Sequence, residues 1–165
     1  MPTPIYRLGV PADAYEIAVM SRYLIEVGLR GWSWPPDRVA KAIKARETCV
    51  LVADVKQHLV GFAIMEFADT SAHLSLFAVK PSHQRCGIGR HMISWLEDSA
   101  LVAGINTISL ELRVNNFAAR TFYRVLGYKE GSYIPGYYRG IETAVKMTRD
   151  IRKVCLLYTS DAADE

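Results

Sequence analysis

The sequence predicts one α/β (α+β) domain with a mixed central sheet and helices on both faces of that sheet. Strand-length apolar runs alternate with helical patterns in the order β-α-α-β-β-β-α-β-α-β-β. Two neighbouring apolar runs are split by three polar residues, which is typical of a hairpin. A Gly-x-Gly sequence joins a strand pattern to a helical pattern and is a candidate ligand site.

Residues 5–46 predict one strand and two helices. The strand is IYRLG, residues 5–9. The first helix is expected over residues 11–27, because apolar residues follow Pro11 at three-to-four spacing: Ile17, Met20, Leu24 and Val27. A proline-rich turn, GWSWPP, precedes the second helix, in which Val39 and Ile43 share a face.

Residues 48–80 predict three strands. The apolar runs 48–55 and 59–68 flank the sequence KQH, which places His58 in a hairpin turn. The next strand spans residues 72–80 and stops at Pro81. His73, near the start of this strand, is interpreted as a surface residue.

The remaining pattern predicts two helices and three strands. A helix over residues 87–103 shows one broad face, formed by Ile88, Met92, Trp95, Leu96, Ser99 and Ala103. In the strand 106–114, apolar and polar residues alternate, so Glu111 points away from the apolar face. Asn115 or Asn116 caps a helix that ends at Gly127, and residues 127–134 and 142–149 supply two final strands.

Residues 155–165 have neither a helical nor a strand period and resemble translated adapter sequence. They are expected to be a non-native read-through tail, which leaves a single domain over residues 1–154. The whole chain has 20 Lys and Arg, 17 Asp and Glu and a net charge of +3, and without the three acids of the tail the net charge is +6. This mild excess suits an acidic ligand, but no basic run interleaves with aromatics, so nucleic acid is not an expected partner.

The cysteine count and the hydropathy indicate a cytoplasmic protein. Cys49, Cys86 and Cys155 are odd in number and have no paired spacing, which favours a reducing compartment. The sequence shows no secretory leader and no apolar run of membrane-spanning length, so no membrane partner is expected. A monomer and a homodimer are both compatible with the sequence.

The turn QRCGIG, residues 84–89, favours an anion. Its glycines let backbone N–H groups approach a ligand, and the helix dipole, Arg85 and Arg90 add positive potential. A P-loop is excluded because no Lys-Ser/Thr pair follows, and a dinucleotide fingerprint is excluded because Met92 stands at its third glycine position. The alternative is that the glycines only allow close packing.

Two motifs together resemble a known superfamily. Gln-x-x-Gly-x-Gly after the strand end AVKP, followed by LELRVNNFAARTFYRVLGY, resembles the GNAT superfamily of acetyl-CoA-dependent N-acetyltransferases. Within it the sequence is most similar to the bacterial ribosomal-protein-alanine acetyltransferase branch, over residues 5–149 and most strongly over 74–128. The resemblance implies a mostly antiparallel sheet of about seven strands, splayed between the fourth and fifth strands to admit the pantetheine arm.

The resemblance also implies roles for individual residues. Main-chain groups of Phe77, Ala78 and Val79 would contact the acetyl-pantetheine unit. Asn116 would contact the cofactor, Glu111 would be the general base, and Tyr123 would bind the cofactor and protonate the departing thiolate. The pyrophosphate would be held by Gln84, Arg85, Cys86, Gly87, Ile88, Gly89 and Arg90.

The chemistry of acetyl transfer needs these residue types. The attacking amine must lose a proton, which a carboxylate accepts directly or through water, and a hydroxyl can return a proton to sulfur. The Val79 N–H would polarise the thioester carbonyl. The alternative interpretations are that Glu111 is only a solvated residue on a strand, and that Tyr123 is only a core residue on a helix face that also carries Phe122 and Leu126.

Other chemically active side chains near the glycines have weaker patterns. His83, Cys86 and His91 bracket the glycines without a zinc spacing, so no metal is expected. Cys86 has no neighbour in sequence that would activate it as a nucleophile.

Two aromatic segments are candidates for contact with the acetyl acceptor. Trp32 and Trp34 are interpreted first as a hydrophobic staple for the following helix, with acceptor binding as the alternative. Tyr133, Tyr137 and Tyr138 are placed in the turn between the last two strands, where the resemblance implies a mobile loop over the acceptor.

The acceptor is an amine whose identity the sequence leaves open. At pH 7 about 10–20% of a terminal α-amine is unprotonated, against about 0.04% of a lysine side chain. Similarity to the ribosomal-protein-alanine branch favours a protein N-terminal α-amine. The alternatives are a small-molecule amine, such as a polyamine, antibiotic or amino acid, and a non-catalytic sensor that binds acetyl-CoA.

Overall fold

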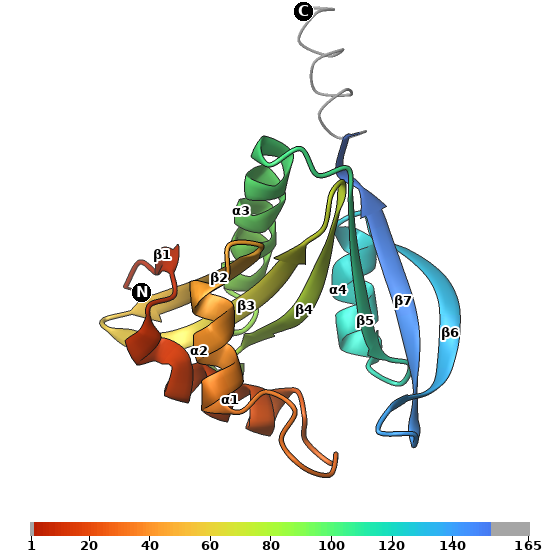
Figure 1. Cartoon of the computed structure of the whole chain (residues 1–165), viewed down its shortest axis with the longest axis horizontal. Coiled ribbons are helices and arrows are strands. Elements are labelled where there is room, and N and C mark those ends of the chain that lie inside the picture. Colours follow the sequence, from red (N-terminus) through yellow and green to blue (C-terminus); the bar gives the residue numbers. More distant parts are fainter. Residues whose placement is uncertain (1, 153–165) are drawn as a thin grey trace, which may run out of the picture. The chain divides into compact units, whose positions relative to one another are not determined.

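The computed structural model describes residues 2–152 (Figure 1). The expected domain end at residue 154 and the expected tail, residues 155–165, lie outside the described residues. No helix among the described residues is long and apolar enough to cross a membrane.

Seven strands form one mixed sheet, which confirms the predicted fold class. The strand order is β1-β2-β3-β4-β5-β7-β6, with β4 and β5 parallel and antiparallel pairs β1–β2, β2–β3, β5–β7 and β6–β7. The strands are β1 (Ile5–Leu8), β2 (Thr48–Val55), β3 (His58–Phe67), β4 (Ser71–Val79), β5 (Thr107–Arg113), β6 (Lys129–Tyr138) and β7 (Glu142–Asp150). The helices are α1 (Ala14–Leu24), α2 (Pro36–Lys44), α3 (Ile88–Val102) and α4 (Phe117–Val125).

The described chain forms two compact units. Unit 1 contains residues 2–67 and 74–96, and unit 2 contains residues 68–73 and 97–152. The parallel ladder between β4 and β5 lies in unit 2 and joins Ser71–His73 to Thr107–Ser109. The expected separation of these strands beyond the ladder stays a prediction.

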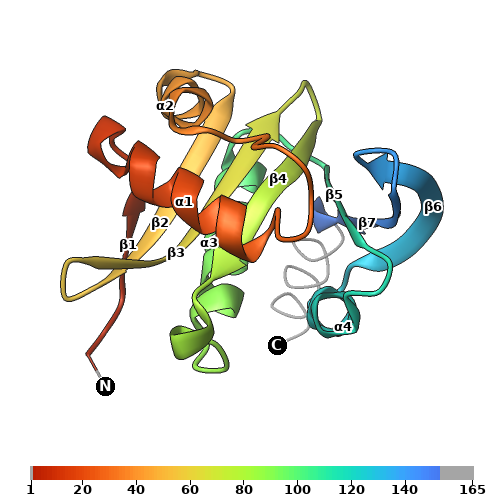
Figure 2. The same cartoon turned by 90° about the horizontal axis from the view of Figure 1, so that it is seen from below.

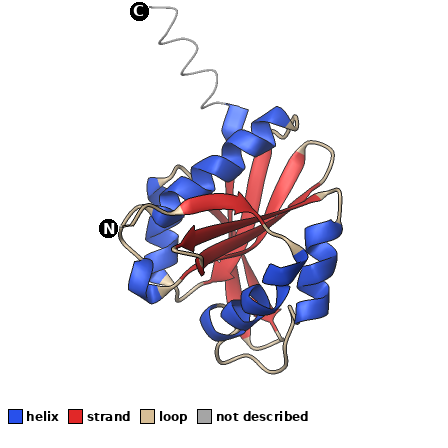
Figure 3. Cartoon of the chain, turned by 90° about the vertical axis from the view of Figure 1, so that its left-hand side faces the viewer, coloured by secondary structure: helices blue, strands red, loops and turns tan. Residues whose placement is uncertain are grey.

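The core of unit 1 covers both faces of β2 and β3. Helices α1 and α2 lie on one face and α3 begins on the other (Figures 2 and 3). On the first face, Ile17 and Val39 pack with Phe62. On the second face, a Cβ built on Gly61 would lie 3.1 Å from the Met92 sulfur. Because both faces are covered, these strands are almost continuous apolar runs, and each fully buried aliphatic side chain contributes roughly 1.5–3 kcal/mol.

The predicted hairpin is confirmed, with a tighter turn than expected. Lys56 and Gln57 have positive φ values of 50° and 67°, as in a two-residue hairpin turn. His58 is the first residue of β3 and therefore does not belong to the turn, where the sequence placed it.

The first helix is shorter than predicted. A 3-10 turn, Pro11–Asp13, precedes α1, and α1 ends at Leu24, so Val27 lies outside the helix and is 56% exposed. Past the end of α1 the buried carboxylate of Glu26 accepts the backbone N–H of Ser33 at 2.6 Å. This local bond competes with continuation of the helix.

The buried stripe of α3 also differs from the prediction. Trp95 and Ser99 are only half-buried and Ala103 lies beyond the helix and is exposed. The buried side chains lie at four-residue spacing from Ile88, together with Ile93, and they are Ile88, Met92, Ile93, Leu96 and Ala100. The predicted face is therefore confirmed at Ile88, Met92 and Leu96, and the buried stripe extends to Ile93 and Ala100 instead of Ala103.

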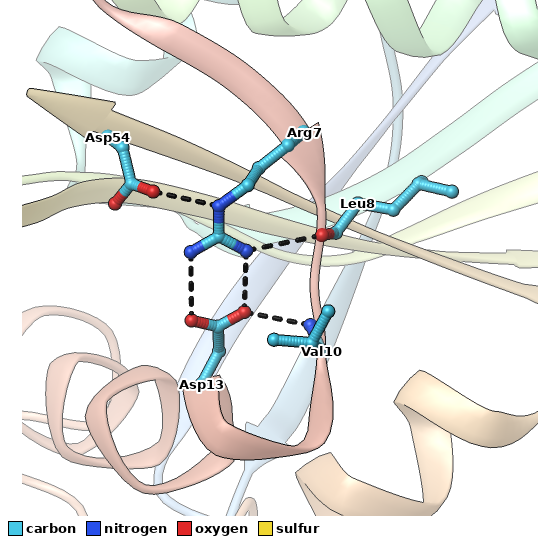
Figure 4. A network of polar contacts seen from close by, with 5 residues as sticks. All are labelled: Arg7, Leu8, Val10, Asp13 and Asp54. Carbon is cyan, nitrogen blue, oxygen red and sulfur yellow. Dashed lines mark hydrogen bonds and ion pairs between the residues drawn. The ribbon is translucent and has the colours of Figure 1, made fainter. Parts of the chain in front are cut away.

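An arginine ties β1 to its neighbours in unit 1 (Figure 4). Arg7 Nε donates to Asp54 on β2 at 2.8 Å, and its two terminal nitrogens donate to Asp13 at 2.8 and 3.0 Å. The Asp13 carboxylate also accepts the Val10 N–H at 2.8 Å. These bonds hold the pKa of Asp13 below its usual value, chiefly through the Arg7 hydrogen bond.

Unit 2 contains a buried polar cluster as well as an apolar core. Helix α4 lies against one face of β5, β7 and β6 (Figures 1 and 2). Glu97 accepts the Tyr128 hydroxyl at 3.0 Å and Arg149 Nη1 at 2.9 Å. Burial raises the pKa of Glu97 despite the opposing charge of Arg149.

The last hairpin places its tyrosines differently from the prediction. Tyr133, Tyr137 and Tyr138 belong to β6, and the turn consists of residues 139–141. Gly136 has a φ of +69° within the strand, and the β6–β7 register shifts between Ile134 and Tyr138. The Pro135-Gly136 pair within this segment thus lies at a β-bulge in an edge strand.

Candidate active site

A loop between β4 and α3 presents a row of backbone donors in unit 1. Within residues 2–152, no backbone hydrogen bond uses the N–H groups of residues 85–90, whereas His91 already donates to Gly87 at 3.0 Å. Arg85 and Gly87 have left-handed φ values of 62° and 88°. Successive N–H groups in such a turn, at the positive end of a helix, form a concave site for an anion.

The loop has room for a ligand at its glycine. A Cβ built on Gly87 would meet no heavy atom within 4 Å, so space is open on that side of the backbone. Any other residue there would be strained by the left-handed φ. Arg85 and Arg90 are exposed and add positive charge to the same loop. The arrangement fits an anionic group such as a pyrophosphate.

Gln84 anchors this loop to the end of β4. Its side-chain amide donates to the Val79 carbonyl at 2.9 Å. The β4 end is itself fixed, since the Lys80 N–H donates to the Val60 carbonyl at 2.8 Å. The side chains of Ala78 and Val79 are buried in unit 1. Phe77, which precedes them, is half-buried. The predicted cofactor contacts 77–79 and 84–90 thus belong to one continuous strand-loop-helix segment.

The histidines and the cysteine near this loop have local partners. Cys86 is exposed, and its thiol donates to the His83 carbonyl at 2.8 Å. The His91 ring stacks on Tyr6 of β1 with 4.1 Å between ring centroids. Among residues 2–152, no group of three or more metal-ligating side chains is close enough to hold an ion.

Glu111 lies in unit 2, on the face of β5 that its sequence pattern predicts. Ile108, Leu110 and Leu112 are buried on the opposite face. Its side chain is 14% exposed, and its Oε2 contacts Nε2 of His73 on β4. The parallel register explains this contact, because His73 pairs with Ser109 and Glu111 follows two residues later on the same face.

The sequence did not predict the contact between His73 and Glu111. His73 and Glu111 are 38 residues apart in the chain, and only the parallel register of β4 on β5 brings them together. An alternating pattern in both strands was visible, but the register that aligns them was not. The His73 side chain is 39% exposed, in agreement with its interpretation as a surface residue, but its contact with Glu111 was not predicted.

Two of the predicted acceptor residues lie in the electrostatic field of Glu111. Burial raises the pKa of both the Tyr137 and Tyr138 hydroxyls, and the Glu111 charge adds to each shift. Their rings meet edge to face with centroids 4.9 Å apart. Arg113, which forms an ion pair with Glu142 at 3.1 Å, lies with its guanidinium 5.8 Å from the Tyr138 ring. The charge of Glu111 thus acts on both of these tyrosine hydroxyls of β6.

Tyr123 and Asn116 belong to α4 in unit 2. Tyr123 is buried between the rings of Phe122 and Tyr128, with centroids 5.1 and 5.5 Å away. Burial raises the pKa of Tyr123, so its hydroxyl keeps its proton at neutral pH. Asn116 is the N-cap of α4, since its side-chain oxygen accepts the Ala119 N–H at 3.2 Å.

The two predicted tryptophans have packing contacts in unit 1. Trp34 is buried in the core, and the Arg38 guanidinium lies 3.8 Å from its ring centroid. Trp32 donates from its ring nitrogen to the Ala18 carbonyl at 3.2 Å. These contacts support the interpretation that GWSWPP fixes the approach to α2.

A family model agrees with these features. The model of the acetyltransferase (GNAT) family matches residues 14–128. The [ribosomal protein bS18]-alanine N-acetyltransferase of Salmonella typhimurium is 36% identical over 104 residues, which is 61% of this chain and 69% of that protein. The Escherichia coli protein of the same name is 35% identical over 96 residues, which is 56% of this chain and 65% of that protein. The chain thus spans about two thirds of the length of these curated relatives.

Solved structures share the fold. The ribosomal-protein-S18-alanine N-acetyltransferase of Escherichia coli superposes with a TM-score of 0.74 at 26% identity, covering 90% of this chain and 94% of that one. An N-acetyltransferase from Thermoplasma acidophilum, solved in complex with coenzyme A, gives a TM-score of 0.76 at 18% identity. The latter match covers 90% of this chain and 99% of the other.

Proposed function

The chain belongs to the acetyltransferase (GNAT) family, and from this premise we propose that it transfers the acetyl group of acetyl-CoA to a primary amine. The observation that supports this most directly is the row of backbone N–H groups at residues 85–90, which have no backbone acceptor within residues 2–152. Charge-assisted hydrogen bonds of this kind contribute about 1.5–3 kcal/mol each. A few such bonds suffice to hold the pyrophosphate of coenzyme A.

The proposed donor contacts are the residues that the resemblance implies. Residues 84–90 hold the pyrophosphate, and main-chain groups of Phe77, Ala78 and Val79 contact the acetyl-pantetheine unit. Asn116 contributes a further contact from the start of α4. The coenzyme A bound to the Thermoplasma acidophilum enzyme is consistent with this choice of ligand.

The proposed reaction is direct attack of the amine on the thioester carbonyl. Glu111 provides the basic site at which the attacking amine loses a proton, and the Val79 N–H stabilises the negative charge that develops on the carbonyl oxygen. Tyr123 returns a proton to the departing sulfur, for which its protonated hydroxyl is suited. No metal ion takes part in this proposal.

We further propose that the acceptor is a protein N-terminal α-amine. The names of the curated relatives, which act on an alanine of a ribosomal protein, support this class. An α-amine also deprotonates about 2.5 pKa units more readily than a lysine side chain, which lessens the demand on the base. Tyr137 and Tyr138 border Glu111 and are the proposed acceptor contacts, whereas the packing of Trp32 and Trp34 gives these two residues an indirect role. The cytoplasm, where new protein N-termini appear, is the proposed location.

The donor is tested by thermal unfolding with acetyl-CoA. A ligand at 100 times its Kd stabilises the native state by about 2.7 kcal/mol, so the Tm should rise by several degrees. Gly89→Trp places an indole in the first turn of α3 and should abolish the rise. Ser94→Trp, at an exposed position of the same helix, is the matched control and should retain it. An unchanged Tm in the native chain would contradict the proposal.

The acceptor is tested by measuring free thiol with a panel of N-terminal peptides, lysine peptides and small amines. Turnover should be fastest with peptides that carry a free α-amine, and N-terminal blocking of the same peptides should abolish it. Faster turnover of polyamines or amino acids would instead indicate a small-molecule enzyme. Binding of acetyl-CoA without turnover of any acceptor would indicate a sensor.

A further inference from the structure

We infer that His73 is the residue that takes the proton from the acceptor amine, with Glu111 orienting the imidazole and stabilising its charged form. The inference rests on the proposed function and assigns the base of that reaction to a pair of residues. The observation behind it is the contact between His73 Nε2 and Glu111 Oε2, within unit 2.

The backbone holds this contact. His73 lies in the three-residue parallel ladder that joins β4 to β5, opposite Ser109. Ser109 and Glu111 face the same side of β5, and His73 lies opposite Ser109 on β4. The side chains of His73 and Glu111 therefore project from neighbouring strands on the same face of the sheet. A contact between two strand residues is set by sheet register and needs no loop to close.

The contact fixes which imidazole nitrogen carries a hydrogen. An ionised carboxylate can only accept, so Nε2 must donate to Glu111. In the neutral ring the lone pair then belongs to Nδ1, which is the atom that can take a proton. Glu111 thereby occupies the position of the orienting acid in a catalytic dyad.

The exposure of the two side chains favours histidine as the group that meets the substrate. The His73 side chain is 39% exposed and the Glu111 side chain is 14% exposed. The less exposed Glu111 carboxylate is suited to orient the ring. The more exposed His73 imidazole is accessible to an amine or a bridging water.

Charged and titratable groups surround the pair on several strands. On β7, Lys146 is the register partner of Glu111, and on β6 the two tyrosines 137 and 138 feel its charge. Arg113, two residues beyond Glu111, is paired with Glu142 of β7. The pH profile of the reaction will therefore reflect the ionisation of all these groups, and variants of His73 are needed to identify its contribution.

The proton balance is simple. The ammonium form of the acceptor first loses one proton to solvent, and the neutral amine forms the C–N bond as His73 Nδ1 accepts its second proton. The C–S bond breaks, and the thiolate receives a proton from Tyr123. His73 and Tyr123 then exchange protons with solvent, so the products are the amide, free coenzyme A and one released proton.

His73→Gln separates a proton acceptor from a group that only positions Glu111. The glutamine amide can still donate to the Glu111 carboxylate, but it cannot accept a proton at neutral pH. We expect kcat/KM to fall about 10²- to 10⁴-fold, and the acidic limb of the pH profile near pH 6–7 to disappear. His58→Gln, at the exposed first residue of β3, is the control and should match the wild type.

His73→Ala adds a second measurement. It opens space at a partly exposed site, and added imidazole should restore turnover in proportion to its unprotonated fraction. Imidazole should not restore Glu111→Gln, because the histidine is present there. A positioning role alone predicts near-wild-type activity in His73→Gln and no rescue of His73→Ala, and this pair of results would overturn the inference.

The two proposals fail in different ways. If the wild-type protein neither binds acetyl-CoA nor acetylates any amine, the proposed function and this inference both fall. If the wild type is active and His73→Gln keeps its rate and its pH profile while the acetyl-CoA shift is intact, only the inference falls.

Discussion

At the residue scale, Tyr123 shows how one side chain can suit both the core and the proposed reaction. Its ring fills space between Phe122 and Tyr128, so the alternative of a core tyrosine is correct as far as the ring is concerned. The same burial raises the pKa of its hydroxyl, which therefore remains a proton donor across the neutral range. Packing and proton donation depend on different atoms and can be separated by substitution.

Tyr123→Phe should keep the packing and remove the proton donor. We expect kcat to fall about 10²- to 10⁴-fold, while acetyl-CoA still raises the Tm. Steady-state kinetics and thermal unfolding measure the two effects. Tyr15→Phe, at a side chain that is 68% exposed on α1, is the control. A Tyr123→Phe variant with the full kcat would remove Tyr123 from the mechanism.

At the element scale, short polar contacts decide where helices and strands begin. The Asn116 side chain opens α4, and the Arg7 guanidinium fastens β1 to β2 and to the turn before α1. Both contacts are local or between neighbouring strands, and neither belongs to the apolar core. Each therefore affects stability in a way that a single substitution can measure.

Asn116→Ala should lower the free energy of unfolding by about 1 kcal/mol, because an N-cap is lost. Asn116→Asp keeps the capping oxygen and should be close to wild type in stability. Asn115→Ala, at the exposed neighbouring position, is the control. Denaturant unfolding measures stability, and titration with acetyl-CoA measures the proposed cofactor contact. If affinity falls in Asn116→Asp while stability is retained, the cofactor contact is supported; unchanged affinity in both variants would contradict it.

Arg7→Met should cost about 1–3 kcal/mol at neutral pH, since two largely covered carboxylates lose their partner. The Asp13 and Asp54 side chains are only 12% and 13% exposed. Because the folded pKa of Asp13 is lowered, its stabilisation is complete above the unfolded value of about 3.9 and is lost as pH falls through the folded value. The difference from wild type should thus narrow below about pH 4. A difference that does not change with pH, or an equal loss in the exposed-site control Arg46→Met, would contradict this account.

The elements also show what a sequence can and cannot reveal. The hairpin of β2 and β3 was predictable because apolar runs and a polar turn are local signals. The end of α1 was missed because the Glu26 carboxylate is used by residues of the next turn. The β6 tyrosines were misplaced because Pro135 and Gly136 suggest a turn, whereas pairing with β7 continues beyond them. His73 could not be assigned because strand register is a long-range property.

At the scale of the whole molecule, the proposed chemistry is divided between the two units. The row of N–H donors lies in unit 1, and the His73–Glu111 pair, Asn116 and Tyr123 lie in unit 2. The two motifs recognised in the sequence correspond to this division. The proposed pyrophosphate contacts and the proposed proton-transfer groups therefore belong to different units and can be perturbed by separate substitutions.

Acetyl-CoA should slow amide hydrogen exchange at residues 85–90. Their N–H groups have no backbone acceptor within residues 2–152, so ligand oxygens would supply the protection. Exchange at the hairpin turn of residues 56 and 57 should not change. Exchange is followed by NMR or mass spectrometry with and without the ligand. Equal rates at 85–90 under saturating ligand would contradict the assignment of the pyrophosphate.

The bulge in β6 has a consequence for solubility. β6 is the last strand in the sheet order, and its free edge could template pairing with another chain. Pro135 removes an amide donor from this strand, and the left-handed Gly136 bends it out of register. Pro135 and Gly136 thus make this edge less able to pair with another chain. A redesign of acceptor specificity that straightened β6 would therefore make its edge more able to pair with another chain.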